Sequence, residues 1–188
     1  MGTLKTTNIQ SISGSGTVTL GTSGETFTVP SGVTISGGLA NTPAFMVLAA
    51  AAFSVPNTTN TAVTFDTEIY DTASAVVNGL FTCPSGQAGK YFFTTNGGLS
   101  TGNDVDEVVW AISKNAQTSL ASTAGDIVCV NYHHDGTQVS DYIQSVSAVF
   151  DVGVGDTVGV RCYQNYGGAK DTATDGRCTF SGYKLIGA

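Results

Sequence analysis

From residue 41 onward, the sequence alternates between short apolar windows and clusters of turn-forming residues, and this pattern restricts the fold more than any other feature. Within windows such as 146–152 and 157–163, apolar residues recur at every second position, while Gly, Asn and Asp gather between the windows. A period of two is typical of strands, and no stretch shows a helical period of useful length. Short strands with regular turns indicate an all-β sandwich or barrel. We expect strands at residues 43–45, 91–93, 105–112, 126–132, 146–152, 157–163 and 178–186, and one through Phe81, while residues 62–67 precede an aromatic loop.

The composition fits one β-rich domain with a short appendage. The chain has 188 residues, of which 41% are hydrophobic and 11% are charged, against the usual ~25% charged. The surface must therefore consist mainly of Thr, Ser, Asn and Gly. A net charge of −7 and the absence of any Lys/Arg cluster predict no nucleic-acid partner.

Neither export nor membrane insertion is expected. Residues 1–8 are polar and lack the apolar stretch of a signal peptide, which predicts a soluble protein made without a leader. The longest apolar run, residues 44–55, is too short to span a bilayer.

Four cysteines, Cys83, Cys129, Cys162 and Cys178, allow three patterns of two disulfides, and the sequence does not choose among them. Their spacing matches no common zinc site. In a reducing cytoplasm they would remain small, buried apolar side chains, which is the interpretation that we favour. Cys162 supports this interpretation because it alternates with Val158 and Val160 on one strand face.

The first 40 residues have a different texture. Three blocks, 16–24, 25–32 and 33–38, each hold two apolar residues two positions apart and end in Gly. They read either as short strands of a trimeric β stem or as a flexible Gly/Ser/Thr linker. We therefore predict an N-terminal anchor or stem at residues 1–40 and a head at residues 41–188. The candidate anchor residues are Leu4, Ile9, Val18, Leu20, Phe27 and Val29.

Aromatic residues at fixed spacings carry a family resemblance. Residues 65–67, 81–84, 89–93 and 180–183 resemble the signature of the complement C1q/tumour necrosis factor-like jelly roll, although the segment between Phe81 and Gly89 is two residues longer. The resemblance covers residues 43–188 and implies an antiparallel jelly-roll sandwich that binds as a homotrimer and is not an enzyme. It also implies that the following residues pack the core and the threefold interface: Phe65, Phe81, Tyr91, Phe93, Phe180 and Tyr183.

A second resemblance concerns the opening of the chain. Residues 2–9 are similar to the start of many structural proteins of tailed bacteriophages. This similarity implies a location in the virion, with the N-terminal segment docked onto a capsid or tail protein.

Few residues point to catalysis or to a metal. His133-His134-Asp135 is the one histidine cluster, and the sequence contains no Gly-x-Ser-x-Gly. Carboxylates gather in residues 103–107 and 171–175, but neither run has the spacing of an established calcium loop. We expect no enzyme activity, no metal site and no cofactor, with calcium as the one option left open.

The loop at residues 163–168 is the candidate ligand site. Tyr163, Asn165 and Tyr166 combine apolar area with paired donors and acceptors, a mixture that commonly binds glycans. The alternative is that Tyr163 points inward and Tyr166 caps the head.

Three functions remain open. The favoured hypothesis is a phage virion structural protein, a trimeric head fibre or capsid decoration spike that adheres to host-surface glycans. The alternatives are the receptor-binding tip of a tail fibre and a soluble C1q-like glycan-binding protein.

Overall fold

The computed structural model describes residues 42–100, 107–115, 127–133, 141–174 and 176–186, together with residues 23–26, 28, 29, 31 and 33. The chain divides into two compact units, residues 1–36 and residues 37–188, and every strand named below lies in the second unit. Within the described ranges there is no helix long and apolar enough to cross a membrane.

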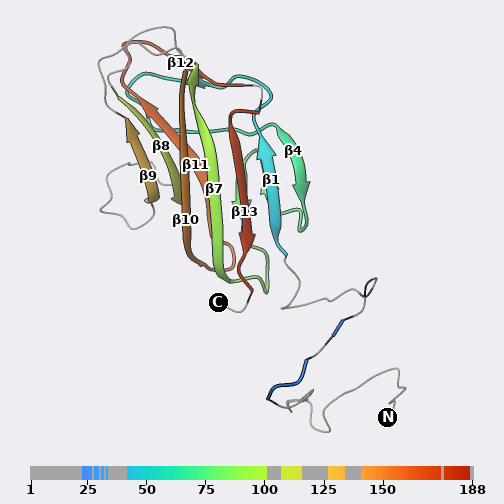
Figure 1. The fold of residues 1–188 in the computed structure, drawn as a ribbon. Helices are drawn as coiled ribbons and strands as arrows, with labels where there is room; N and C mark the ends of the chain where they lie inside the picture. Colours follow the sequence, from blue (N-terminus) through green and yellow to red (C-terminus); the bar gives the residue numbers. More distant parts are fainter. Residues whose placement is uncertain are drawn as a thin grey trace. The chain divides into compact units, whose positions relative to one another are not determined.

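Sheet A is built around β7 (Gly89–Ser100), which is paired along both edges. On one edge, β10 (Asp141–Val152) pairs antiparallel with β7 along its whole length. The other edge pairs first with β13 (Thr179–Lys184) and then with β12 (Lys170–Thr172). The sheet continues from β13 to β1 (Ala44–Leu48) and β4 (Thr67–Asp71), while β2 (Ser54–Val55) pairs with β12. Figure 1 shows β10, β7, β13, β1 and β4 side by side.

Sheet B is centred on β11 (Thr157–Gln164). Its order is β5 (Val76–Val77), β6 (Leu80–Thr82), β11, β8 (Val108–Lys114) and β9 (Ile127–His133), and β3 (Thr61–Ala62) pairs with β11 beyond β6. All pairings in both sheets are antiparallel. Buried and less buried residues alternate along much of β7 and β11, because successive side chains point to opposite faces, whereas the first six residues of β8 are all buried.

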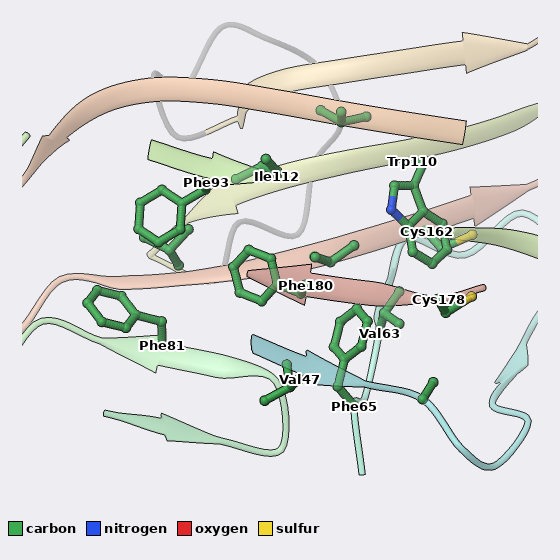
Figure 2. Close-up of a cluster of buried hydrophobic side chains, with 14 of the residues drawn as sticks. Val47, Val63, Phe65, Phe81, Phe93, Trp110, Ile112, Cys162, Cys178 and Phe180 are labelled. Carbon is green, nitrogen blue, oxygen red and sulfur yellow. The ribbon is translucent and has the colours of Figure 1, made fainter. Parts of the chain in front are cut away.

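An aromatic cluster fills the space between the sheets, as Figure 2 shows. The rings of Phe45, Phe81, Phe93 and Phe180 are almost completely buried, and the centroids of Phe45 and Phe180 lie 5.1 Å apart with an edge-on arrangement. Tyr91 and Phe93 are stacked at 5.7 Å. Removal of such a ring from a packed core costs about 3–5 kcal/mol, so this cluster contributes much of the stability of the sandwich.

Trp110 on β8 links sheet B to sheet A through hydrogen bonds. Its Nε1 donates a hydrogen bond to Thr95 Oγ1 on β7 at 3.1 Å, and that hydroxyl donates to the carbonyl of Thr179 on β13 at 2.7 Å. The indole lies directly over Gly97, where a Cβ atom would overlap the ring. Glycine is therefore required at this position by packing, and not by a turn.

A tight hairpin joins β5 and β6. Asn78 and Gly79 have φ angles of 51° and 80°, the left-handed conformation of a two-residue hairpin loop. A Cβ atom on Gly79 would also overlap the ring of Phe65, so the hairpin seals one side of the core.

Strands lie at the segments expected from the sequence, with shifted ends, and residues 63–66 between β3 and β4 form no strand. The largest shift is in β7, which continues to Ser100, whereas the sequence predicted an end at Phe93. The next largest is in β10, which begins at Asp141, whereas alternation predicted a start at Val146. The earlier start arises because β7 continues to Ser100 and offers pairing partners to Asp141–Ser145.

We predict that Gly97→Ala destabilises the domain, because the new methyl group forces the Trp110 ring away from Thr95. Overpacking of this kind costs about 1–3 kcal/mol, which lowers the melting temperature by roughly 2–10 °C. Thermal unfolding followed by circular dichroism measures the change.

Gly168→Ala is the matched control, because a Cβ atom on Gly168 meets no atom within 4 Å. Equal melting temperatures for the two variants would contradict the proposed role of Gly97.

Candidate interaction surface

The outer face of sheet A is the face of β10, β7, β13, β1 and β4 that points away from the core. The strand register aligns its side chains in rows that run across the sheet. The three central rows are Val149–Phe92–Tyr183–Ala44, then Ser147–Thr94–Ser181–Met46–Tyr70, then Ser145–Asn96–Thr179–Leu48–Thr67.

The first of these, which we call the apolar row, consists of Val149, Phe92, Tyr183 and Ala44. The Phe92 and Tyr183 rings are tilted against each other with centroids 5.4 Å apart. Val149 is 53% exposed and Tyr183 is 41% exposed. Single exposed apolar residues are normal on a protein surface, but large ones aligned in one row mark an interaction surface.

Polar groups border the apolar row on both sides. Toward one end of the strands, Lys90 Nζ and Asp151 Oδ1 form an exposed ion pair at 2.9 Å. Toward the other end, β10, β7 and β13 carry hydroxyl and amide groups, and Ser145 Oγ donates to Asn96 Oδ1 at 2.7 Å. On β1, Met46 and Leu48 continue the second and third rows. An apolar centre with a polar rim is the usual composition of a protein–protein interface.

The sequence-predicted packing residues separate into two groups. Phe65, Phe81, Tyr91, Phe93 and Phe180 lie in the core of one chain, whereas Tyr183 lies in the apolar row on the opposite face.

Sequence reasoning did not select Phe92 or Val149. The signal was available, because the alternation that buries Tyr91 and Phe93 directs Phe92 outward.

The loop at residues 164–168 is held in place by side-chain hydrogen bonds to its backbone. Asn57 Oδ1 accepts hydrogen bonds from the backbone nitrogens of Tyr166 and Gly167 at 2.7 and 2.9 Å. Gln164 is fully buried, and its Nε2 donates to the carbonyls of Val55 and Gly168 at 3.0 and 2.8 Å. The loop is therefore an ordered element of the surface.

The three candidate ligand residues of this loop are all half-buried. The Lys170 ammonium lies 4.1 Å from the centroid of the Tyr166 ring, a cation–π contact. The backbone nitrogen of Asn165 donates to the carbonyl of Glu107 at 3.1 Å. Tyr166 packs against the hydrophobic core and its hydroxyl is buried, whereas Tyr163 and Asn165 are half-buried.

The described carboxylates with shifted pKa values accept hydrogen bonds from backbone nitrogens in turns and loops. Lys114 first, and then the backbone nitrogen of Gly153, lower the pKa of Asp156, which closes the turn between β10 and β11. The backbone nitrogens of Ala50 and Ala51 lower the pKa of Asp66 by hydrogen bonding. Both groups therefore stay ionised as structural acceptors.

Within the described ranges, no group of three or more His, Cys, Asp or Glu side chains is placed to hold a metal ion. His134 and Asp135 lie outside the described residues, as do residues 103–106 and Asp175, while Asp171 is exposed on β12. The candidate anchor residues Leu4, Ile9, Val18, Leu20 and Phe27 also lie outside them, and Val29 is half-buried. The anchor remains a prediction.

No protein-family model and no curated protein sequence matches the chain. Solved structures do match it. Murine APRIL at pH 8.0 gives a TM-score of 0.53 and 12% identity, over 76% of this chain and 98% of that chain. Eiger TNF from S. frugiperda gives 0.50 and 13% identity, over 79% and 96% of the two chains. The globular domain of a zebrafish complement 1qA protein gives 0.48 and 19% identity, over 76% and 97%.

The similarity to APRIL and Eiger, together with the two antiparallel sheets, confirms the predicted C1q/TNF-like jelly-roll fold. At these sequence identities, the similarity establishes the fold alone.

We predict that Asn57→Ala releases the loop at residues 164–168, because two backbone N–H groups lose their acceptor. Each lost hydrogen bond costs about 1 kcal/mol, so the amides of Tyr166 and Gly167 should exchange roughly 10-fold faster or more. Hydrogen exchange followed by mass spectrometry measures the change. Asn57→Asp retains the acceptor oxygen and should retain the protection; equal loss in both variants would show that Asn57 does not hold the loop.

Proposed function

We propose that the protein is a non-enzymatic binding module that self-associates as a homotrimer through the outer face of sheet A. The observation that carries the proposal is the apolar row, in which Val149, Phe92 and Tyr183 lie in register across three strands. An interface over this row removes apolar area from water at about 25 cal/mol per Å². The three central rows hold no charged group, so covering them costs less desolvation free energy than burying ions would.

The trimeric state is supported by the C1q/TNF-like resemblance of residues 43–188. In a closed cyclic trimer every copy of the interaction surface is covered by a neighbouring chain, so the assembly stops at a defined size. It also presents three copies of each loop, and weak single contacts with a target then add by avidity.

We place this trimer in a phage virion, as a head fibre or capsid decoration spike with its N-terminal segment docked on a capsid or tail protein. The support is the resemblance of residues 2–9 to tailed-phage structural proteins and the repeated apolar pairs in residues 16–38. The candidate contact with a host-surface glycan consists of Tyr163 near the end of β11 and of Asn165 and Tyr166 in the ordered loop at residues 164–168. The two alternatives, a receptor-binding tail-fibre tip and a soluble glycan-binding protein, would use the same jelly-roll head. They differ in whether the head is attached to a tail fibre or is free.

We predict that Val149→Glu converts the assembly to monomers, because the substitution buries a carboxylate in the apolar row. An unpaired buried charge costs several kcal/mol, so the dissociation constant should rise by at least about 100-fold. Sedimentation velocity and light scattering over a range of protein concentrations measure the oligomeric state.

Val154→Glu is a closely matched control. Val154 is 57% exposed against 53% for Val149, but it lies in the turn between β10 and β11 and outside the apolar row. This variant should remain assembled. Monomeric wild-type protein, or an assembled Val149→Glu variant with an unchanged melting temperature, would overturn the proposal.

A second prediction tests the location. Removal of residues 1–40 should leave a soluble trimer, because the interface lies on strands that begin at Ala44. The same deletion should abolish incorporation into phage particles, measured by immunoblotting of purified virions and by cryo-electron microscopy. Full-length protein that is absent from particles would move the function to a free glycan-binding protein, and a deleted chain that still co-purifies would contradict the anchor.

A further inference from the structure

Two buried thiols come from opposite sheets to the same end of the core. Cys162 lies on β11 of sheet B, and Cys178 directly precedes β13 of sheet A. Both are fully buried and reduced. Figure 2 shows the two sulfur atoms facing the same region beside Trp110.

The contacts of Trp110 place both cysteines near its indole ring. Cys162 is the cross-strand partner of Trp110 in sheet B. On sheet A, the indole is linked through Thr95 to the carbonyl of Thr179, the residue that follows Cys178. The Cys178 thiol contacts the carbonyl of Gly98 at 3.8 Å, next to the Gly97 that the indole covers.

The raised pKa values of the two thiols are consistent with the proximity of Cys162 and Cys178. Burial first, and then the neighbouring Cys178, raise the pKa of the Cys162 thiol. Burial also raises the pKa of Cys178. Both groups are therefore neutral thiols in the folded protein, and attack by either one requires exposure to water.

The position of Cys83 excludes it as a partner for either thiol. Its backbone nitrogen bonds to the carbonyl of Asp156, six residues before Cys162, a separation of about 20 Å along a strand. Its thiol lies 3.8 Å from the Tyr91 hydroxyl, whereas Cys178 contacts Gly98, seven residues further along β7. A disulfide needs Cα atoms within about 7 Å.

The backbone position of Cys129 excludes a bond to Cys162. Cys129 pairs with Ile112, which pairs in turn with Val160 on β11. Two strand spacings are about 10 Å, which is beyond the reach of a disulfide.

We propose that Cys162 and Cys178 form an inter-sheet disulfide when the chain folds in the presence of a small-molecule disulfide such as oxidised glutathione. One thiolate attacks a sulfur of oxidised glutathione, and the first glutathione leaves from the resulting mixed disulfide. The second thiolate then attacks the protein sulfur, and the second glutathione leaves. Two protein thiols are oxidised, one oxidised glutathione is reduced to two molecules, and the two thiol protons pass through water to the glutathione thiolates.

This bond closes a loop over residues 163–177, which contains the candidate ligand loop and β12. It joins sheet A to sheet B beside Trp110, where hydrogen bonds already link them. The disulfide would constrain the unfolded chain by closing this loop. Because the sulfurs are buried, the redox conditions during folding decide which form persists. This inference is independent of the proposed virion function.

The full-length chain provides a direct test, because trypsin separates all four cysteines. Cleavage after Lys or Arg places Cys162 in peptide 162–170, Cys178 in 178–184, Cys83 in 6–90 and Cys129 in 115–161. Reduced, denatured protein is refolded with reduced and oxidised glutathione, its free thiols are alkylated, and the peptides are identified by mass spectrometry. We expect peptides 162–170 and 178–184 to be covalently linked, and the melting temperature to rise by roughly 5–10 °C over the reduced form.

Two controls sharpen the result. Folded, reduced protein in the same buffer should oxidise at least about tenfold more slowly, because exchange requires local opening. A Cys83→Ala, Cys129→Ala double variant should give the same linked peptides, and Cys162→Ala should give none. A link that involves Cys83 or Cys129, or four alkylated thiols after refolding, would overturn the proposal.

Discussion

The two-residue period of β7 is the constraint on which the rest of the structure depends. Tyr91, Phe93 and Thr95 point into the core, so Phe92, Thr94 and Asn96 must point outward. Because alternate residues of β7 fill the core, the residues between them lie on the outer face of sheet A. On that face Phe92 aligns with Val149 and Tyr183, and a further copy of the chain is a partner that can cover it.

The scarcity of charge acts together with this geometry. Charged residues form 11% of the chain, and the outer face of sheet A follows the same composition, with hydroxyl and amide groups beside the apolar row. Such groups cost less to desolvate than charged ones when they form hydrogen bonds across an interface, whereas a lysine or glutamate in the same place would oppose burial. The ion pair of Lys90 and Asp151 lies at the border of the row, where solvent screens it and where it can set orientation without a large desolvation cost.

Alternation and aromatic spacing were enough to predict the fold, because both depend on local geometry. The turn at residues 153–156 and the burial of Phe81, Tyr91, Phe93 and Phe180 follow from short windows of sequence. The start of β10 did not, because it depends on the length of the partner strand β7. The apolar row was missed for a similar reason. Phe92 and Val149 lie 57 positions apart in the sequence, and only the strand register brings them together.

The same reasoning explains why the cysteines resisted prediction and what the structure adds. Four cysteines allow several pairings, and spacing in the sequence says nothing of which strands face each other. The register places Cys83 and Cys178 at opposite ends of β7, through Tyr91 and Gly98, and so removes one pairing by distance alone. Trp110 marks the place where Cys162 and Cys178 approach, and Gly97 makes room for its ring. The core, the outer face of sheet A and the thiol pair are therefore all arranged around β7. A change in the core-facing side chains of β7 should alter both the apolar row and the oxidation of Cys162 and Cys178 near Gly98.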